Sequence, residues 1–338
     1  MRKQLLRYKW ANLPSAPGPA RRGLAAHWPQ VLKRSTLFAL IAKLPETTMT
    51  LSAAQTIETE RGRFAWREGG ESGGVPVVMI HGWPESSYCW AHVSDHLKPG
   101  LRVIAPDLRG LGDSERTQGL EPYRKENLAL DVISMLDALG IGRFQLVGHD
   151  WGGVVAQEVA LAIPERVERL VILNIAIINN LRGNQEVIEK VRSGSGSQYW
   201  YQHFMQTRDL PEAMIAGAEA AWLGYFLKLA NREPFPKDAF DEYVRTFQIP
   251  GTPHTSSNYY RTFHDDARRW ASLAGHVWPM PGLYIYGNRD HIILPEYLNH
   301  IEDCFTSVTV HEVDAGHFLQ EEQPEEVAGH LNSFLCSA

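Results

Sequence analysis

The sequence predicts an α/β fold in which a mostly parallel sheet carries helices on both faces, with a helical segment inserted between two of its strands. Short, continuously apolar runs such as Val75–Ile80 and Val167–Leu173 are typical of strands that are buried on both faces. Amphipathic stretches alternate with these runs, and Tyr123–Leu139 carries apolar residues at helical spacing. The alternation stops near Asn179 and resumes at Gly282, which predicts the insertion.

Patterns along the chain predict the individual elements. Eight strands are expected, two within Thr56–Arg67 and then Val75–Ile80, Leu101–Ala105, Arg143–Val147, Val167–Leu173, Gly282–Tyr286 and Val308–Val313. Helices are expected at Tyr123–Leu139, Val154–Ala162 and Gln323–Leu335. Gly140 would end the first of them, and Pro324 stands at the start of the last. Because strand and helix alternate, we expect most of the strands to run parallel.

The inserted segment, residues 179–274, is helix-like and rich in aromatic side chains. Open α/β sheets bind their ligands beyond the carboxyl ends of the strands. An insertion after the sixth strand would cover that edge. We therefore interpret 179–274 as a helical cap domain, and 49–178 together with 275–338 as the core.

The first 48 residues differ from the rest in charge. They contain nine lysines and arginines and a single acid, Glu46. We expect residues 1–48 to be a disordered basic extension, or sequence upstream of a true start at Met49. An Arg-rich, acid-poor targeting segment is the alternative.

Composition limits the class of protein. A chain of 338 residues with 44% hydrophobic and 21% charged residues is typical of a soluble globular protein. The net charge of −6 argues against nucleic acid or an anionic membrane as a partner. Cys89, Cys304 and Cys336 are far apart and have no metal-ligand spacing, which favours a reducing compartment, here the cytoplasm, without disulfides.

The segment Gly148-His149-Asp150-Trp151-Gly152 has the Gly-x-nucleophile-x-Gly pattern of a tight strand-to-helix turn. Small residues are required on both sides, because a Cβ two positions away has no room in this turn. The nucleophile position holds aspartate. A carboxylate attacks esters and amides poorly, but it can displace a leaving group from an sp³ carbon and form an ester with the enzyme. Asp150 is therefore the candidate nucleophile.

Hydrolysis of such an ester needs a base, a group that orients the base, and donors for the oxyanion. Asp290 and His317 each follow a predicted strand, so both would lie at the carboxyl edge of the sheet. We expect His317 to be the base and Asp290 its partner. His291 and His311 are the rival bases. An acid directly after the sixth strand is disfavoured, because Asn174 stands there.

The run His81–Pro84 follows the third predicted strand. The backbone N–H groups of Trp83 and Trp151 are expected to form the oxyanion hole. Since a backbone donor works whatever its side chain, both indoles are free to line the pocket with apolar surface. His81 and His149 are expected to be structural neighbours of these turns.

Together these motifs resemble the α/β-hydrolase-fold epoxide hydrolases, over nearly the whole chain from about residue 50. The resemblance rests on His81–Pro84, on Gly148–Gly153 with Asp150, on Asp290 and on His317. It implies an eight-stranded sheet with a helical cap after the sixth strand. It also implies that an epoxide is converted to a vicinal diol through an ester on Asp150, without a metal or another cofactor. A small-molecule epoxide is then the expected partner, and a monomer or homodimer the expected state.

In that family the cap supplies two tyrosines that hold the epoxide oxygen. The first lies in a Trp-Tyr-x-x-Phe-like segment, which Trp200–Phe204 matches, and this implies Tyr201. The second lies in an Asn-aromatic-Tyr-Arg segment, which Asn258–Arg261 matches, and this implies Tyr260. Tyr199 and Tyr259 are the neighbouring alternatives, and the substrate pocket is expected to include Trp83, Trp151, Trp200 and Tyr259.

Two related families are rivals for the chemistry. Haloalkane dehalogenases share the aspartate turn followed by tryptophan, but typically have asparagine where this chain has Trp83. Fluoroacetate dehalogenases carry arginines just after the nucleophile, where this chain has Trp151 and Val154. An alkoxide leaving group needs a proton donor such as a phenol, whereas a halide needs only weak donors. An epoxide hydrolase is therefore favoured over a haloalkane dehalogenase, and a non-catalytic binding protein is the minor alternative.

Overall fold

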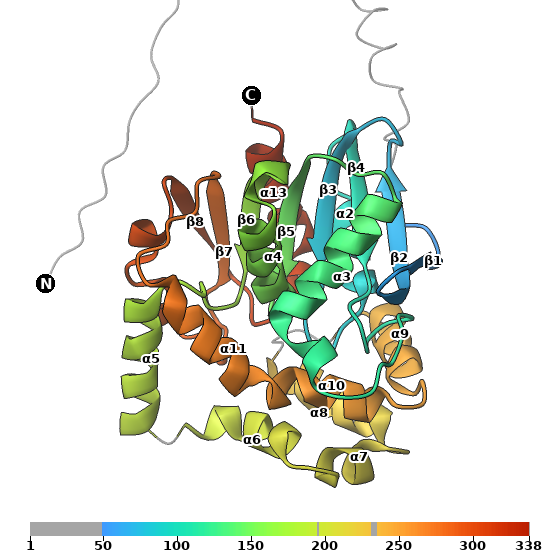
Figure 1. Ribbon diagram of the computed structural model, residues 1–338, viewed down its shortest axis with the longest axis vertical. Coiled ribbons are helices and arrows are strands. Elements are labelled where there is room, and N and C mark those ends of the chain that lie inside the picture. The colour runs from blue at the N-terminus through green and yellow to red at the C-terminus, as the bar shows by residue number, and fades with distance from the viewer. Residues whose placement is uncertain (1–48, 195, 231–234, 338) are drawn as a thin grey trace, which may run out of the picture. The chain divides into compact units, whose positions relative to one another are not determined.

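An eight-stranded sheet lies at the centre of the computed structural model, which describes residues 49–194, 196–230 and 235–337 (Figure 1). The strand order is β1-β2-β4-β3-β5-β6-β7-β8. β2 pairs antiparallel with β1 and β4, and the other pairings are parallel. The prediction of a mostly parallel eight-stranded sheet is confirmed, whereas the expectations for residues 1–48 lie outside the described residues. The strands are β1 Gln55–Thr59, β2 Gly62–Gly70, β3 Val75–Ile80, β4 Leu101–Pro106, β5 Phe144–His149, β6 Val167–Leu173, β7 Gly282–Gly287 and β8 Val308–Val313.

The central strands are continuous apolar runs because both of their faces are covered. Every residue of β5 and β7 is buried, as are the last four residues of β3. β8 lies at the edge of the sheet, and only its last residue, Val313, is fully buried. The β-branched residues of β8 identify it as a strand in spite of this exposure.

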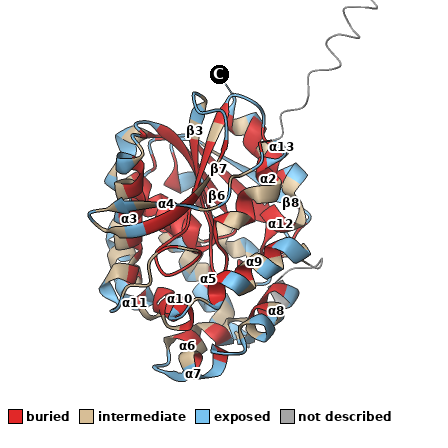
Figure 2. Ribbon diagram, turned by 90° about the vertical axis from the view of Figure 1, so that its right-hand side faces the viewer, coloured by how far each residue is buried: buried red, intermediate tan, exposed pale blue. Residues whose placement is uncertain are grey.

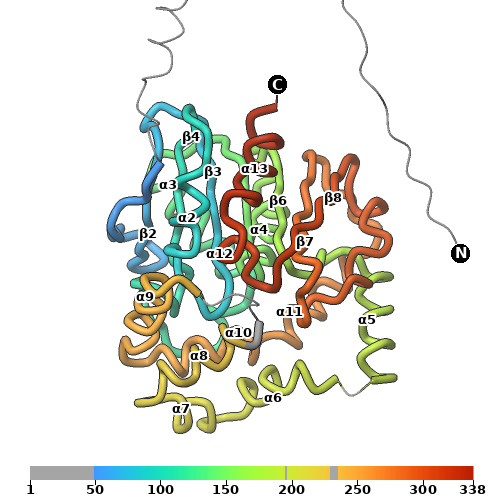
Figure 3. The backbone as a smooth tube through the Cα atoms, turned by 180° about the vertical axis from the view of Figure 1, so that it is seen from behind, coloured from blue at the N-terminus to red at the C-terminus, as the bar shows by residue number. Residues whose placement is uncertain are grey.

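Helices cover both faces of the sheet. α3 (Lys125–Ala138) and α4 (Trp151–Ala162) pack side by side on one face, and α2 (Ala91–Ser94) packs against α13 (Pro324–Leu335) on the other (Figures 1 and 3). α3 begins two residues later than predicted, because Arg124 has an extended backbone. α4 begins three residues earlier than predicted, directly after Asp150.

Between β6 and β7 the described residues form seven α-helices, which we call the helical insertion (residues 179–274). α6 to α10 lie beyond the end of the sheet at which the parallel strands finish (Figures 1 and 3). The insertion therefore stands next to the edge at which the predicted catalytic loops begin. Its α-helices are α5 Leu181–Ser193, α6 Trp200–Gln206, α7 Leu210–Ile215, α8 Glu219–Ala230, α9 Lys237–Phe247, α10 Thr252–Arg261 and α11 Phe263–Trp270.

Buried residues follow the strands and the helix faces next to them, and continue into the helical insertion (Figure 2). Met205, Tyr243 and Phe247 of the insertion are as inaccessible as the sheet residues, and they belong to the same apolar cluster. The insertion is thus fixed to the sheet by a shared core. No helix among the described residues combines the length and the apolar character needed to cross a membrane.

Candidate active site

Asp150 stands at the tip of a tight turn between β5 and α4. Its backbone has φ +48° and ψ −129°, a conformation that residues other than glycine rarely adopt. A Cβ on Gly148 would lie 2.5 Å from the carbonyl oxygen of Gly152, and a Cβ on Gly152 would lie 2.2 Å from that of His81. Strain of this kind costs about 1–3 kcal/mol and concentrates at active sites. The turn therefore admits only glycine on either side and aims the carboxylate at the insertion.

The carboxylate of Asp150 is buried but has polar partners on both oxygens. Oδ1 accepts the backbone N–H of Trp83 at 2.8 Å, and Oδ2 lies 3.4 Å from Nε2 of His317. Burial alone would raise the pKa of Asp150, but the hydrogen bond and charge of His317 outweigh burial and lower it, with a smaller contribution from the Trp83 amide. Asp150 is therefore ionised, as a nucleophile has to be.

His317 lies between two carboxylates. Its Nδ1 is 2.7 Å from Oδ2 of Asp290, whose Oδ1 accepts the N–H groups of Ile292 (2.6 Å) and Ile293 (3.0 Å). Burial lowers the pKa of His317, but Asp290 and Asp150 raise it well above its ordinary value. The structure thus brings together the three residues that the sequence predicted, with the imidazole held by Asp290 and facing Asp150.

The rival histidines occupy other places. His311 lies on the edge strand β8 and stacks on His330, with ring centroids 4.4 Å apart. His291 is exposed and lines the pocket described below, one residue after the partner of His317. His317 is therefore the histidine that contacts both Asp150 and Asp290.

Asn174, which directly follows β6, ties the two catalytic loops together. Its side-chain amide donates to the carbonyl oxygens of Gly316 (2.9 Å) and His317 (3.0 Å) and accepts the N–H of Gly287 (2.8 Å). In the sequence Asn174 counted only against an acid at this position. Its place directly after a buried strand was the available signal for a structural role.

A second buried link runs behind the nucleophile. Nε2 of His149 lies 2.8 Å from the carbonyl oxygen of His317, and Nδ1 lies 2.9 Å from Oε2 of Glu85. Gln320 donates to the other oxygen of Glu85 at 2.7 Å. His149 thus supports the backbone of the candidate base, in keeping with a structural role. Glu85 was not predicted, and its place directly after the His81–Pro84 run was the available signal.

His81 supports the other side of the turn. Its Nδ1 lies 2.8 Å from the carbonyl oxygen of Gly82, and Nε2 lies 3.0 Å from the backbone nitrogen of Leu108. Burial lowers the pKa of His81. A neutral imidazole that donates through Nδ1 and accepts through Nε2 satisfies both contacts.

Tyr201 on α6 and Tyr260 on α10 face one another above Asp150. Their ring centroids are 5.7 Å apart, and both rings pack on Trp83, at 6.0 Å and 5.3 Å. Burial, with the nearby charge of Asp150, raises the pKa of both phenols. Both hydroxyls therefore stay protonated at neutral pH and are able to donate.

The neighbouring tyrosines are turned away from this site. The hydroxyl of Tyr199 donates to the carbonyl oxygen of Ile292 at 2.8 Å, and that of Tyr259 donates to the carbonyl oxygen of Arg109 at 2.7 Å. The expectation that Tyr259 lines the pocket is wrong. Tyr259 and Tyr260 follow one another on α10, so their side chains point in directions about 100° apart, and only one can face the pocket.

The candidate groups open onto a cavity of 260 Å³. Asp150, His317, Tyr201 and Tyr260 all line it. The remaining wall is mostly aromatic, and includes Trp83, Trp200, Tyr225, Phe226 and Phe318. A more open hollow of 380 Å³ beside Arg63 and Arg116 contains none of the candidate catalytic groups. The smaller cavity is therefore the candidate substrate pocket.

Trp151 departs from expectation in one respect. Its indole is not among the side chains that line the cavity, and instead packs edge-on against Tyr260, with ring centroids 5.6 Å apart. Its backbone N–H lies in the first turn of α4, where amides have no partner within the helix. The predicted place of this N–H in the oxyanion hole remains a prediction, and the indole supports the pocket from behind.

In the described part of the chain, no group of three or more His, Cys, Asp or Glu side chains is arranged to hold a metal ion. The acids and histidines of the site are instead engaged with one another or with backbone groups, as the distances above show.

Comparison with known proteins identifies the family. Residues 75–324 match the family described as alpha/beta hydrolase fold. The soluble epoxide hydrolase of Corynebacterium sp. is 30% identical over 279 residues, which cover 78% of this chain and 91% of that protein. Epoxide hydrolase A of Mycobacterium tuberculosis is 28% identical over 312 residues, covering 82% and 96%. Among solved structures, epoxide hydrolase A from Mycobacterium thermoresistibile is 25% identical, with a TM-score of 0.72 over 85% of this chain and 98% of that one. The chain belongs to the α/β-hydrolase fold family and, within it, to the epoxide hydrolases.

Proposed function

We propose that the protein hydrolyses an epoxide to a vicinal diol through a covalent ester on Asp150. One observation carries the proposal. A buried, ionised carboxylate, a histidine held from behind by Asp290, and two protonated phenols all line the same 260 Å³ cavity. Ring opening needs a nucleophile on one side of a C–O bond and a proton donor on the other, and these groups supply both.

In the first step Asp150 attacks an oxirane carbon. The C–O bond to that carbon breaks, and Tyr201 and Tyr260 donate to the oxygen that leaves. The raised pKa of each phenol keeps its proton in place until the alkoxide, which is far more basic, develops. The product is a glycol monoester of Asp150.

In the second step His317 activates water. While Asp150 is ionised, its charge helps to hold the pKa of His317 high. Esterification removes that charge, so the pKa of His317 falls and the imidazole becomes able to accept a proton from water. The hydroxide formed attacks the ester carbonyl, and the N–H of Trp83, already on Oδ1, stabilises the tetrahedral oxyanion together with that of Trp151. Collapse of this intermediate breaks the bond between the acyl carbon and the glycol oxygen, which takes the hydroxyl proton of the intermediate, so that the diol leaves and Asp150 is a carboxylate again. The proton on His317 returns to the phenol that gave one up in the first step.

The aromatic wall supports an apolar substrate, such as an aryl-bearing epoxide. Trp200 and Tyr225 are 42% and 47% exposed and line the same cavity, so they offer aromatic surface to an arriving substrate. We infer that the helical insertion acts as a cap domain that supplies both phenols and most of this wall. No cofactor takes part in the proposed reaction.

Haloalkane dehalogenation is the second candidate, and one observation favours it. The indole nitrogen of Trp83 is buried and, among the described residues, has no hydrogen-bond partner. An indole N–H of this kind could receive a halide. The same nucleophile and base would then serve both reactions.

Product analysis separates the candidates. Purified protein is incubated with styrene oxide and, separately, with a bromoalkane, and diol and bromide are measured. We expect diol from the epoxide and no bromide above background. Bromide without diol would establish the dehalogenase, and neither product would favour a binding protein.

The variant His317→Gln tests the covalent step. We expect it to form the ester but not to hydrolyse it, so mass spectrometry of the protein after incubation with epoxide should show one adduct on the peptide that contains Asp150. Asp150→Ala is the control and should show none. Full turnover by His317→Gln without an adduct would remove His317 from the mechanism.

A further inference from the structure

Lys125 is a lysine with no exposed side-chain surface, at the first residue of α3. Lysines are almost never fully buried unless their ammonium group is paired, because the cost of removing the charge from water is large. Nothing in the proposed mechanism uses this residue. Its burial therefore needs another explanation.

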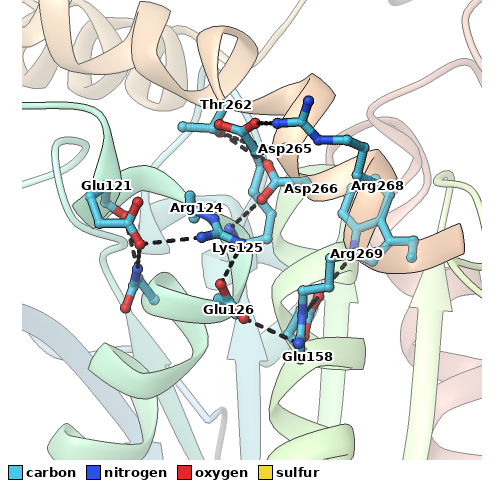
Figure 4. Close-up of polar contacts among 12 residues, drawn as sticks. Glu121, Arg124, Lys125, Glu126, Glu158, Thr262, Asp265, Asp266, Arg268 and Arg269 are labelled. Atoms are coloured by element: carbon cyan, nitrogen blue, oxygen red, sulfur yellow. Dashed lines mark hydrogen bonds and ion pairs between the residues drawn. The ribbon is translucent and has the colours of Figure 1, made fainter. Parts of the chain in front are cut away.

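The ammonium of Lys125 is bonded to the end of α10 and the start of α11. Nζ lies 2.9 Å from Oδ2 of Asp266 and 2.9 Å from Oγ1 of Thr262, and it also donates to the carbonyl oxygen of Tyr259. The backbone N–H of Lys125 reaches the other oxygen of Asp266 at 3.2 Å. All three donors of the ammonium are thus used on one segment of the insertion, residues 259–266, which contains Tyr260. Figure 4 shows Lys125 beside Thr262 and Asp266.

The same ammonium stands over the ring of Trp151. Nζ is 4.2 Å from the ring centroid, a distance at which the attraction between a cation and an aromatic face is substantial in a buried site. The rings of Trp151 and Tyr260 pack nearly perpendicular to one another, with their centroids 5.6 Å apart. Lys125 is therefore linked to Tyr260 in two ways. It binds the carbonyl oxygen of Tyr259, the residue before Tyr260, and it contacts the indole of Trp151, which packs against the ring of Tyr260.

We infer that Lys125 is a positioning residue for ring opening, which fixes Trp151 and the end of α10 so that Tyr260 faces Asp150 across the pocket. The inference rests on the proposed function. Lys125 itself touches no reacting atom. Its effect would come from orientation, and a displacement of about 1 Å of a catalytic group can slow a reaction about 10²-fold.

A neighbouring ion pair between the insertion and the core provides a matched control. Nη2 of Arg269 on α11 lies 2.9 Å from Oε2 of Glu158 on α4, and Nη1 lies 3.2 Å from Oε2 of Glu126 on α3 (Figure 4). This pair also joins α11 to the core and also includes a buried carboxylate, since Glu158 is 2% exposed. Its contacts are with α3 and α4 rather than with the ring of Trp151.

The test compares two paired variants. Lys125→Met alone would leave the buried carboxylate of Asp266 without a positively charged partner. The double variant Lys125→Met/Asp266→Asn therefore removes both charges together. Arg269→Met/Glu158→Gln is the control. Ester formation and ester hydrolysis are measured separately, by single-turnover quench with an aryl epoxide, in the natural and in the Tyr260→Phe background.

We expect Lys125→Met/Asp266→Asn to slow ester formation about 10- to 100-fold and to leave ester hydrolysis nearly unchanged. The loss should largely disappear in the Tyr260→Phe background, because a misplaced phenol and a missing phenol are equivalent. The control pair should retain both rates. Should the first pair prove unable to fold, Thr262→Val, which removes one acceptor of the ammonium, should show the same selective loss at smaller size.

Three results would overturn the inference: equal slowing of both steps, an undiminished loss in the Tyr260→Phe background, or the same selective loss in the control pair. The proposed function is judged separately, from diol formation by the unmodified protein. If the unmodified protein forms diol but the Lys125 and Thr262 variants show no selective slowing of ester formation, the positioning role is refuted and the proposed function stands.

Discussion

Nε2 of His317 lies 3.4 Å from Asp150, and Nδ1 lies 2.7 Å from Asp290. One imidazole therefore interacts with the carboxylate of Asp290 and with that of Asp150, whose charge the proposed reaction removes. In that mechanism the first step prepares the second, because the pKa of His317 falls and the imidazole becomes available to accept a proton only when the ester exists. This coupling has a measurable consequence for pH dependence.

Ester formation and ester hydrolysis should respond differently to pH. The lowered pKa of Asp150 keeps the nucleophile ionised, so ester formation should be level from about pH 5 to about pH 8. Hydrolysis needs neutral His317 and should rise with pH through a single pKa, so ester should accumulate on the acid side. Rapid-quench measurements of the ester at several pH values test this. If both steps titrate together, the charge of Asp150 does not control His317.

The two phenols allow a test with neighbouring controls. Tyr201→Phe and Tyr260→Phe should each slow ester formation, by about 10²–10⁴-fold where that phenol is the main proton donor. Tyr199→Phe removes a hydroxyl of the same kind that donates to a backbone carbonyl and not to the substrate, so it should leave the rate nearly unchanged. Steady-state diol formation measures all three. Full activity in both Tyr201→Phe and Tyr260→Phe would instead favour the dehalogenase.

At this scale the sequence identified residues whose place follows from their own strand. Asp150, Asp290 and His317 follow the ends of β5, β7 and β8 within four residues, and parallel strands bring such positions to one edge. Glu85 and Lys125 could not be found in the same way. Their partners lie far along the chain, on segments whose packing depends on the tertiary structure.

At the scale of elements, the sequence predicted the strands more precisely than the inserted helices. Strands β3, β6 and β8 have the predicted bounds, because runs of apolar or β-branched residues mark them directly, although β8 is exposed. The insertion was predicted as helical only as a whole, since short helices packed on several sides carry no single apolar stripe. The rotation of α10 could not be read from the sequence either, and this is why Tyr259 was wrongly placed in the pocket.

The turn between β5 and α4 is the element whose geometry is tightest. In Gly152→Ala the new Cβ would meet the backbone carbonyl of His81 at 2.2 Å, so strand β3 or the turn would have to move. We expect a loss of stability of at least about 1–3 kcal/mol and loss of activity. Urea denaturation and diol formation measure both.

Gly329→Ala is the control for that experiment. Gly329 lies within α13, and a Cβ there would meet nothing within 4 Å. Alanine should stabilise this helix by about 0.5–1 kcal/mol and leave activity unchanged. A Gly152→Ala protein as stable and active as Gly329→Ala would mean that β3 and the turn approach one another less closely than described.

At the scale of the whole molecule, buried polar groups join the insertion to both layers around the sheet. Glu321 on α12 (Leu319–Glu322) accepts the hydroxyl of Tyr243 on α9 and lies 3.3 Å from Nδ1 of His92 on α2. The insertion is therefore held by shared apolar core and also by a carboxylate that has almost no access to water. Such a group makes the stability of the whole fold depend on pH.

Burial raises the pKa of Glu321 to about 6, with a contribution from the charge of Glu85. A carboxyl group whose pKa is higher in the folded than in the unfolded chain stabilises the fold when it is protonated. For Glu321 this stabilisation is complete below the unfolded pKa, near 4.5, and is lost as pH rises through the folded pKa of about 6. His92, whose pKa is also raised, mainly by Glu321, acts in the same direction, and its stabilisation is lost above its ordinary pKa of 6.5. From the raised pKa values of both groups we expect the free energy of unfolding to fall as pH rises from about 5 to about 8.

Glu321→Gln should flatten this dependence. The variant cannot ionise, and it also removes the main cause of the raised pKa of His92, so it should gain up to about 2 kcal/mol relative to the natural protein on going from pH 5 to pH 8. Glu296→Gln is the control, because the pKa of Glu296 is lowered by Lys190 and its titration lies below this range. Urea denaturation at each pH measures the difference. Parallel curves for the natural protein and Glu321→Gln would mean that Glu321 carries the same charge in the folded and unfolded chains throughout this range.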